Sequence, residues 1–284
     1  FLDTYSLVCK PDQLIKRRGK SGLVQLNESW NNVAQWLQSH RGKEVQIERV
    51  GGRLTHFLVE PVVSQLSFGQ FVPHKTSDEY YLCIRCERAG DEILFCSQGG
   101  VDVGDVEAKV SIVSRLGQAS RVSVPIDDDL ETQRLAQLFN GVPDARAAVA
   151  SASEFVMDLF KCFRALHFSF IEINPFVIAD DLQVHILDLA SKLDETARFE
   201  CSKMWGNLEF PAPFGRPHLP EEVAVMEMDG KTGASLKLTI LNPKGRIWTM
   251  VAGGGASVVF ADTICDLGFS HELANYGEYS GGLR

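Results

Sequence analysis

Hydrophobic residues recur along the chain with two spacings, one typical of strands and the other of helices. Two apolar runs of strand length, residues 172–178 and 184–190, are joined by the polar turn 179–183. A helix over residues 29–39, capped by Asn27, is predicted by apolar residues at helical spacing, namely Trp30, Val33, Trp36 and Leu37. We therefore expect a β-hairpin and a helix with one core-facing side.

The same spacings predict further elements. A second helical region covers residues 127–168, with a cap at Ser151 or Ser153. Its apolar stripe consists of Phe155, Leu159, Cys162, Phe163 and Leu166. Strands at 80–87 and 92–96 form a hairpin, because Gly90 and Asp91 suit the turn between them.

The segment from 210 to 220 contains four prolines and is unsuited to regular structure, so it marks a domain boundary. Beyond it the pattern changes to strand, loop, strand, glycine loop and helix. A buried strand is expected at 247–251, followed by a helix over 258–267. The chain is therefore expected to form two domains with mixed α and β structure.

Three polar side chains interrupt the apolar hairpin and are candidate metal ligands: Glu172, Asn174 and Asp188. Mg²⁺ prefers oxygen ligands and takes one or two carboxylates together with substrate phosphates. A hairpin that brings Asn174 near Asp188 would hold a metal-bound nucleotide. On composition alone, an ordinary buried hairpin with capping Asn and Asp residues explains the same pattern.

A basic run precedes the first helix and includes Lys10, Arg17, Arg18 and Lys20 around Gly19. Arg offers a planar fork to phosphate oxygens and Lys a point charge, while Gly lets the backbone approach closely. This composition fits a triphosphate-binding site, a nuclear localisation signal, a nucleic-acid-binding patch or a solvated loop.

Glycine loops supply further candidates. The triple glycine 253–255 stands between a strand and a helix, where free amides and the helix dipole favour an anion. The turn 229–234 contains Gly-Lys-Thr but lacks the earlier glycine of a P-loop, because position 225 is Val. The loop 99–105 could coordinate a cation, but three Gly and two Asp in seven residues more often mark only a tight turn.

Composition narrows the class of protein. The 284 residues are 45% apolar and 23% charged, as in soluble globular proteins, and the net charge of −9 argues against nucleic acid as a partner. The sequence contains no run of eighteen apolar residues that would predict a membrane span, and its N-terminus lacks the pattern of a signal peptide. Seven scattered cysteines favour reduced thiols in the cytosol, with Cys83 and Cys86 treated as core.

Several long strings resemble one family. Lys-Pro-Asp-Gln-Leu-Ile-Lys-Arg-Arg-Gly-Lys from Lys10, the Glu-Ile-Asn-Pro hairpin from Glu172, and the strings 236–259 and 275–281 are similar to the ATP-citrate lyase family. The resemblance extends over essentially all of the chain. It implies an ATP-grasp domain, N-terminally truncated, over 1–208, a Pro-rich linker over 209–220, and the truncated start of a flavodoxin-like, citrate-binding α/β domain over 221–284.

The resemblance also implies site residues. The ATP-binding positions are Lys10, Arg17, Arg18, Gly19, Pro61, Val63, Glu79 and Asp188. Val72 is an alternative to Val63, because residues 62–70 look like an insertion. The metal positions are Asn174, Asp188, Asp229, Thr232 and Ala234, and the citrate positions are Gly253, Gly254, Gly255 and Gly281.

The reaction implied is that of citrate, ATP and CoA, giving acetyl-CoA, oxaloacetate, ADP and phosphate, with Mg²⁺ as cofactor. None of the seven histidines lies in the family's phosphohistidine context, so we expect that residue in another region or on a partner subunit. The chain alone should then be inactive. A succinyl-CoA synthetase-like ligase subunit and a non-catalytic assembly subunit remain as alternatives.

Overall fold

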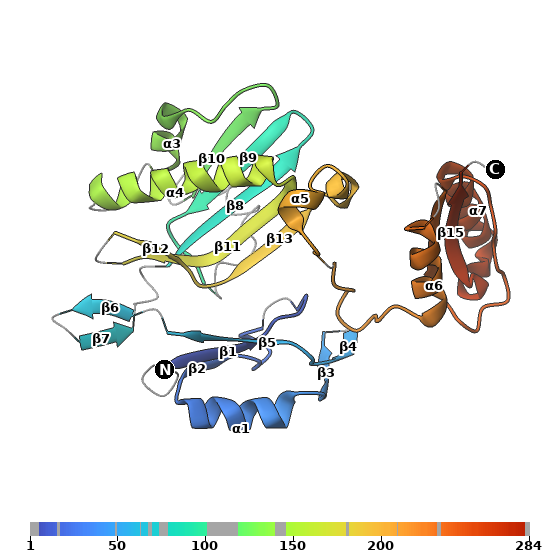
Figure 1. Ribbon diagram of the computed structural model, residues 1–284, viewed down its shortest axis with the longest axis horizontal. Coiled ribbons are helices and arrows are strands. Elements are labelled where there is room, and N and C mark those ends of the chain that lie inside the picture. The colour runs from blue at the N-terminus through green and yellow to red at the C-terminus, as the bar shows by residue number, and fades with distance from the viewer. Residues whose placement is uncertain are drawn as a thin grey trace. The chain divides into compact units, whose positions relative to one another are not determined.

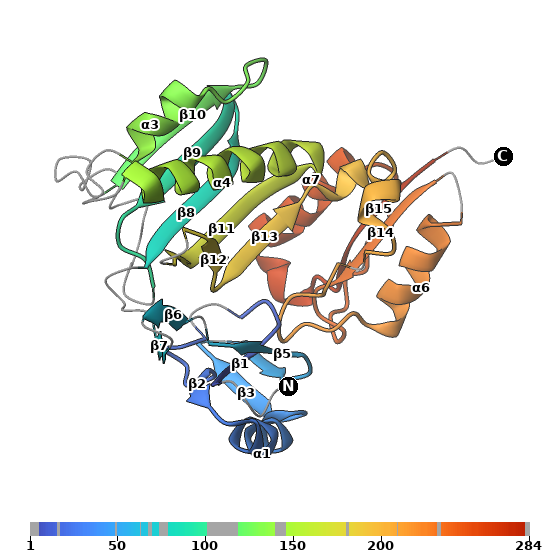
Figure 2. The same ribbon diagram turned by 60° about the vertical axis from the view of Figure 1, so that its left-hand side comes forward.

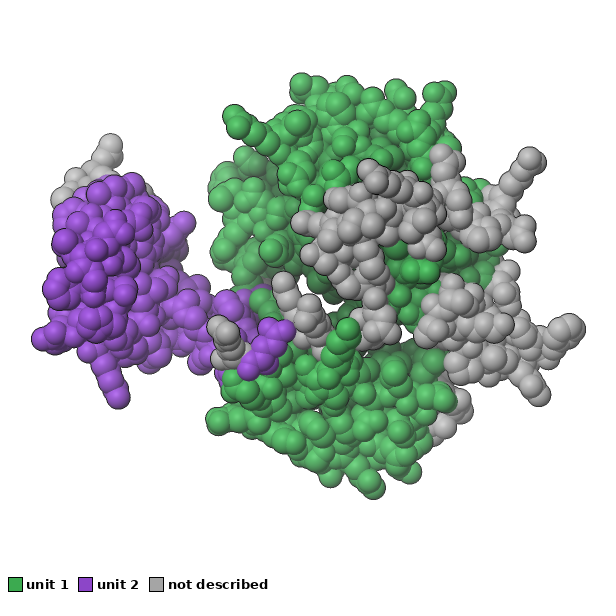
Figure 3. Space-filling view, turned by 180° about the vertical axis from the view of Figure 1, so that it is seen from behind, with its two compact units in different colours: residues 1–47, 53–210 green, residues 48–52, 211–284 purple. Residues whose placement is uncertain are grey.

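The structure is a computed structural model of the 284-residue chain. It describes residues 6–15, 18–48, 50–62, 64–67, 70–73, 79–100, 119–139, 146–179, 182–208, 210–231 and 234–281. The chain divides into two compact units, which Figure 3 colours separately: residues 1–47 with 53–210, and residues 48–52 with 211–284. Among the described residues, no helix combines the length and the apolar character needed to cross a membrane.

A six-stranded antiparallel sheet forms the larger part of the first unit (Figure 1). Its order is β10-β9-β8-β11-β12, and β13 also pairs with β11. The strands are β8 (Tyr80–Glu87), β9 (Gly90–Cys96), β10 (Ala119–Pro125), β11 (Phe168–Ile178), β12 (Val184–Ile186) and β13 (Leu189–Leu193). The predicted hairpins β8–β9 and β11–β12 are both present, but the predicted strand 184–190 is interrupted at residues 187–188, and Leu189 begins β13.

Two helices, α3 (Thr132–Leu138) and α4 (Arg146–Ala165), cover one face of this sheet (Figure 2). Because side chains alternate along a strand, Leu82, Ile84 and Ile173 point to this face. They join Phe160 and Phe163 of α4 in the largest apolar core. The opposite face carries a smaller cluster around Tyr81 and Cys83.

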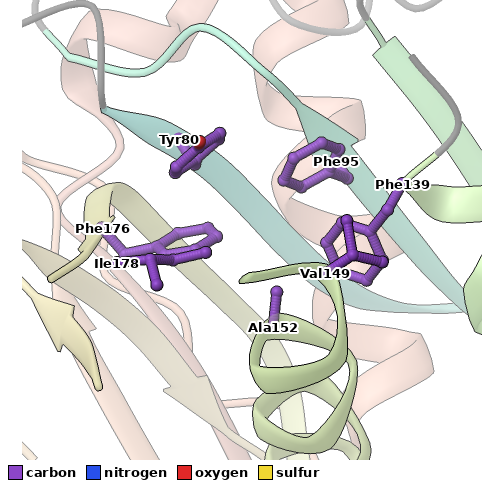
Figure 4. Close-up of a pocket in the computed structure, with 7 residues that line it drawn as sticks. All are labelled: Tyr80, Phe95, Phe139, Val149, Ala152, Phe176 and Ile178. Atoms are coloured by element: carbon purple, nitrogen blue, oxygen red, sulfur yellow. The ribbon is translucent and has the colours of Figure 1, made fainter. Parts of the chain in front are cut away.

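Aromatic rings fill the end of this core near β12. Figure 4 shows Tyr80, Phe95, Phe139 and Phe176 turned toward a cavity of about 10 Å³, which Val149, Ala152 and Ile178 also line. The Phe95 and Phe139 ring centroids lie 4.8 Å apart. The cavity is apolar and has about the room of one water molecule, so it is a packing feature and no nucleotide site.

A three-stranded antiparallel sheet, ordered β2-β1-β5, completes the first unit together with α1 (Trp30–His40). Its strands are β1 (Leu7–Pro11), β2 (Gln25–Glu28) and β5 (Phe57–Pro61). Leu7, Cys9 and Val33 are fully buried where α1 covers one face of this sheet. Lys10 belongs to β1 but alternates with Cys9, so it stands on the other face.

Two short hairpins and two short helical segments complete the described part of the chain up to residue 210. The hairpins are β3 (Glu44–Ile47) with β4 (Val50–Arg53), and β6 (Ser64–Ser67) with β7 (Gln70–Pro73). The stretch 62–70, predicted as an insertion, thus contains one arm of the β6–β7 hairpin. After β13 come a 3₁₀ turn, Glu195–Arg198, and the short helix α5 (Ser202–Trp205).

The second unit contains a two-stranded sheet and two main helices. β14 (Ser235–Ile240) pairs with β15 (Asn275–Ser280), α6 (Pro220–Asp229) packs against β14, and α7 (Gly254–Ile264) packs against β15. A π-helical turn, Cys265–Phe269, and a 3₁₀ turn, Ser270–Glu272, follow α7. Residues 211–219 form neither helix nor strand.

Some predictions about elements were wrong. Ser29, whose hydroxyl accepts from the Asn32 amide, caps α1, whereas Asn27 has a left-handed backbone. Ser151 and Ser153 lie inside α4 and do not cap it. Two cysteines assigned to the core, Cys86 near the end of β8 and Cys162 on α4, are exposed. On α4 the buried positions instead include Val156, Phe160 and Phe163.

The predicted buried strand 247–251 is also wrong. It makes only isolated parallel bridges, Ile247 with Leu273 and Ala252 with Tyr279, among the described residues, and Met250 is 86% exposed. The side chain of buried Asn275 replaces the ladder here: its Oδ1 accepts from the Thr249 amide at 2.7 Å, and its Nδ2 donates to the Thr249 carbonyl at 2.8 Å. The segment is therefore held by the Asn275 side chain together with backbone hydrogen bonds at Ile247.

Candidate nucleotide and carboxylate sites

Lys10 and Arg18 converge on Asp188 in the first unit. The Lys10 ammonium donates to the Leu187 carbonyl at 2.6 Å and lies 3.5 Å from Asp188 Oδ1. Arg18 Nη2 donates to the same Asp188 oxygen, and its Nη1 donates to the Pro11 carbonyl at 2.6 Å. The cluster thus joins the face of the three-stranded sheet opposite α1 to the segment between β12 and β13.

The position of Lys10 requires these partners. Lys10 is 7% exposed, and a buried ammonium is costly unless it is paired and hydrogen-bonded. A third oxygen satisfies it, because Glu60 Oε2 of β5 lies 3.1 Å from its Nζ. Two cations and two carboxylates therefore form one neutral group.

Asn174 lies beside Asp188, as the sequence predicts for a metal hairpin. Its backbone amide donates to the Asp188 carbonyl at 3.0 Å. Its side-chain Oδ1 accepts from the Gly100 amide at 2.7 Å. A carbonyl oxygen has two lone pairs, so Asn174 retains the capacity to bind a cation while it holds Gly100.

Glu79 belongs to the same neighbourhood. Its carbonyl accepts from the Gly99 amide at 2.6 Å, and a Cβ added at Gly100 would lie 2.2 Å from Glu79 Oε2. The backbone of Gly100 also has a φ of +90°, a conformation that favours glycine, and a side chain there would require the Glu79 carboxylate to move. Gly100 thus contacts both the Asn174 side chain and the Glu79 carboxylate.

Glu172 occupies the same sheet face as Asn174, two residues earlier on β11. Its Oε1 accepts from the Tyr81 hydroxyl at 3.0 Å. Burial, together with the neighbouring Cys83 and Glu172, raises the pKa of Tyr81 far above its usual range, so the phenol is a permanent donor. Burial also raises the pKa of Cys83 to about 12, so its thiol stays protonated at neutral pH.

The donor set of the described residues suits a Mg²⁺ ion held jointly by protein and phosphate oxygens. Within the described ranges, no three His, Cys, Asp or Glu side chains gather in a way that would hold a metal. One carboxylate, Asp188, and one amide oxygen, Asn174, would leave most positions of an octahedral ion to water and phosphate.

Two of the remaining predicted ATP positions, Gly19 and Pro61, directly follow members of this group in the chain. Gly19 follows Arg18 in a turn that the Gly22 amide closes on the Gly19 carbonyl at 3.1 Å. Pro61 ends β5 directly after Glu60. Arg17 and Val63 lie outside the described residues, and the side chain of Val72 is not described.

Glu60 was not predicted as a site residue. Its carboxylate stands in the middle of the cluster, yet in the sequence it reads as an ordinary polar residue in an apolar strand. The register supplies the signal: Glu60 is opposite Val8, so it shares a sheet face with Lys10. That register could not be read without knowing that β1 pairs with β5.

The predicted citrate residues lie at one edge of the second unit. The Gly253 amide donates to the Tyr279 carbonyl at 3.1 Å, and Gly281 follows two residues later. Ala252 forms an isolated parallel bridge with Tyr279 of β15, so the triple glycine and Gly281 both follow shortly after this bridge.

Two predicted metal positions are close to this edge. A Cβ added at Gly281, whose φ is +145°, would lie 2.3 Å from Ala234 Cα. Asp229 Oδ1 accepts from the Leu236 amide at 2.6 Å and so fixes the start of β14. Thr232 lies outside the described residues.

A carboxylate of the protein already lies at the N-terminus of α7. A Cβ added at Gly254 would lie 3.1 Å from the carboxyl carbon of Glu278, whose Oε1 accepts from the Tyr276 hydroxyl at 2.8 Å. This hydrogen bond is the main cause that raises the pKa of Tyr276. An anionic ligand at the triple glycine would have to displace Glu278 or share the helix terminus with it.

Comparison with known proteins decides the family. Residues 1–205 match the sequence model described as "ATP-citrate synthase ATP-grasp domain", and residues 216–283 match the one described as "ATP citrate lyase citrate-binding". The chain belongs to the ATP-citrate synthase family. The predicted resemblance is thereby confirmed, as is the α/β fold class.

Relatives in the ATP-citrate synthase family match nearly the whole chain. The ATP-citrate synthase of Mus musculus is 50% identical over 283 residues, which are 99% of this chain and 24% of the mouse protein. The "Probable ATP-citrate synthase subunit 2" of Schizosaccharomyces pombe is 43% identical, over 97% of this chain and 58% of that protein.

A solved structure of ATP citrate lyase from Methanothrix soehngenii, in complex with citrate and coenzyme A, has a TM-score of 0.80 and 42% identity. It matches 99% of this chain, which in turn covers 61% of that structure. The chain therefore spans less than two thirds of the length of these family members.

Proposed function

We propose that this chain is the ATP-binding and citrate-binding part of an ATP-citrate synthase. The complete enzyme would convert citrate, ATP and CoA to acetyl-CoA, oxaloacetate, ADP and phosphate. The proposal rests above all on one observation: Lys10 and Arg18 converge on Asp188, beside Asn174.

Each residue would have a distinct task at this site. Lys10 and Arg18 would hold phosphate oxygens, with Arg offering two N–H groups in a fixed fork and Lys a point charge. Asn174 and Asp188 would hold Mg²⁺, which when bound neutralises charge on the phosphates. Glu79 and Pro61 would contact the nucleoside. Positioning and charge neutralisation supply most of the catalysis in phosphoryl transfer.

Citrate would bind in the second unit, at the edge formed by Gly253–Gly255 and Gly281. This proposal is supported by the match to the citrate-binding family model and by the citrate complex of the Methanothrix soehngenii relative. We also propose that the phosphohistidine and the CoA site lie on further sequence or on a partner subunit. A relative named as a subunit supports such an assembly.

Two measurements test the proposal. Calorimetry on this chain should detect Mg-ATP binding, and citrate binding in a separate titration. The full-length protein with its partner should release ADP in a coupled assay when citrate, ATP and CoA are all present. Release of ADP with succinate in place of citrate would instead identify a succinyl-CoA synthetase-like ligase. Absence of Mg-ATP binding would refute the proposal. We propose the cytosol as the site of this reaction, to be checked by fractionation.

A further inference from the structure

Lys10 is shared between two carboxylates that come from different sheets. Glu60 Oε2 lies 3.1 Å from its Nζ and Asp188 Oδ1 lies 3.5 Å from it. The Lys10 and Arg18 side chains are 9% and 15% exposed, whereas those of Glu60 and Asp188 are 36% and 39% exposed. The cations are thus held inside, and the carboxylates form the side of the cluster that meets solvent.

The two carboxylates differ in what they can do when a nucleotide arrives. Asp188 follows β12 beside Asn174, so it can turn to a cation that this pair holds. Glu60 sits on β5, opposite Val8, and its strand position keeps it on the face that carries Lys10. It therefore remains next to Lys10 in the loaded site as well.

We propose that Glu60 is a specificity-determining residue that makes this site discriminate against metal-free nucleotide. The inference rests on the proposed function, because it assumes that the cluster receives a triphosphate. Glu60 cancels the charge of Lys10, so that metal-free ATP meets a neutral group of two cations and two carboxylates.

The discrimination follows from charge. The repulsion between Glu60 and a ligand is proportional to the ligand's charge, and a bound Mg²⁺ removes two of the negative charges of ATP, about half of the total. Removing the Glu60 charge should therefore help metal-free ATP about twice as much, in free energy, as it helps Mg-ATP. For a partly exposed site, a gain of about tenfold for metal-free ATP corresponds to about threefold for Mg-ATP.

The experiment compares Glu60→Gln with the unmodified chain by calorimetry, with ATP in EDTA and with ATP in excess Mg²⁺. We expect the variant to bind metal-free ATP about tenfold more tightly and Mg-ATP about threefold more tightly. The ratio of the affinity for Mg-ATP to that for metal-free ATP should therefore fall about threefold. Glu44→Gln is the matched control, because Glu44 pairs at 3.5 Å with the exposed Arg53. It removes the same charge and should change neither affinity.

Glu60→Asp tests whether the effect comes from the charge or from the length of the side chain. It keeps the carboxylate, so it should keep most of the preference for Mg-ATP over metal-free ATP. Equal gains for both ligands in Glu60→Gln, or no gain, would overturn the inference. Failure of both Glu60→Gln and Glu60→Ala to show a cooperative thermal transition would make Glu60 a structural residue and overturn it equally. Absence of Mg-ATP binding in the unmodified chain is the separate result that refutes the proposed function.

Discussion

Replacing Asp188 by Asn should change the affinity for ATP in opposite directions, depending on whether Mg²⁺ is present. With Mg²⁺, the variant loses one of the two protein ligands proposed for the cation. A hydrogen bond or ligand contact to a charged group contributes about 1.5–3 kcal/mol, so Mg-ATP should bind roughly 10- to 150-fold more weakly.

Without Mg²⁺, the same substitution should strengthen ATP binding. Arg18 and Lys10 both contact Asp188 Oδ1, so the wild-type carboxylate competes with phosphate for these cations. The amide of the variant is neutral and competes less. Titration calorimetry of each variant with ATP, in EDTA and in excess Mg²⁺, measures both effects on one protein.

Asp158→Asn is the matched control, because Asp158 lies on α4 with a side chain 68% exposed and pairs with Lys161 at 2.9 Å. It should leave both affinities unchanged. A loss in Asp188→Asn that is equal with and without Mg²⁺ would show that Asp188 does not act through the metal. Unchanged affinity in both conditions would remove Asp188 from the site altogether.

Three further predictions concern other parts of the molecule. Phe163→Ala should cost about 3–5 kcal/mol of unfolding free energy in a denaturant titration, because the ring is 1% exposed in the main core; a cost under about 1 kcal/mol would contradict this packing. Gly281→Ala should abolish citrate binding in calorimetry, since the new Cβ would meet Ala234 at 2.3 Å; unchanged citrate affinity would exclude this edge. Glu222→Gln should destabilise the second unit by about 1–3 kcal/mol at pH 7, and progressively less on acidification, in thermal unfolding monitored by circular dichroism.

The pH dependence of the last prediction follows from the environment of Glu222. Burial alone would raise its pKa, but hydrogen bonds from the Leu219 and Ile240 amides and the charge of Arg216 outweigh burial and lower it. A carboxyl with a lowered pKa stabilises the folded state above its unfolded pKa of about 4.3. That stabilisation disappears as the pH falls through the folded pKa. A difference between variant and wild type that persists unchanged at pH 3 would contradict this account.

The resemblance of sequence strings to a family grouped residues of the first candidate site that spacing alone did not group. Asp188 lies 170 residues after Arg18 in the chain, and only the resemblance to a family placed Lys10, Arg18 and Asp188 in one site. The structure brings them into contact through two sheets. Glu60 was not predicted because nothing local distinguishes it; its position beside Lys10 depends on strand register, which arises from long-range pairing.

Periodicity predicted the hairpins and the existence of the helices, but it failed at their boundaries and in the second unit. The run 247–251 is apolar enough for a buried strand, yet Met250 is 86% exposed. The side chain of Asn275, twenty-six residues away from Thr249, holds this segment in place of a full ladder. Hydrophobic spacing carries no information about a distant side chain that replaces backbone pairing.

The close packing of Gly52 and Gly215 has a practical consequence for dividing the chain. A Cβ at Gly215 would lie 2.3 Å from the Gly51 carbonyl oxygen, and one at Gly52 would lie 2.8 Å from the Gly215 nitrogen. Residues 48–52 thus belong to the same compact body as residues 211–284, although nearly 160 residues separate them. A single proteolytic cut near residue 210 would leave the C-terminal piece without this short segment, and expression of that piece alone would expose the surface on which Val50 normally rests.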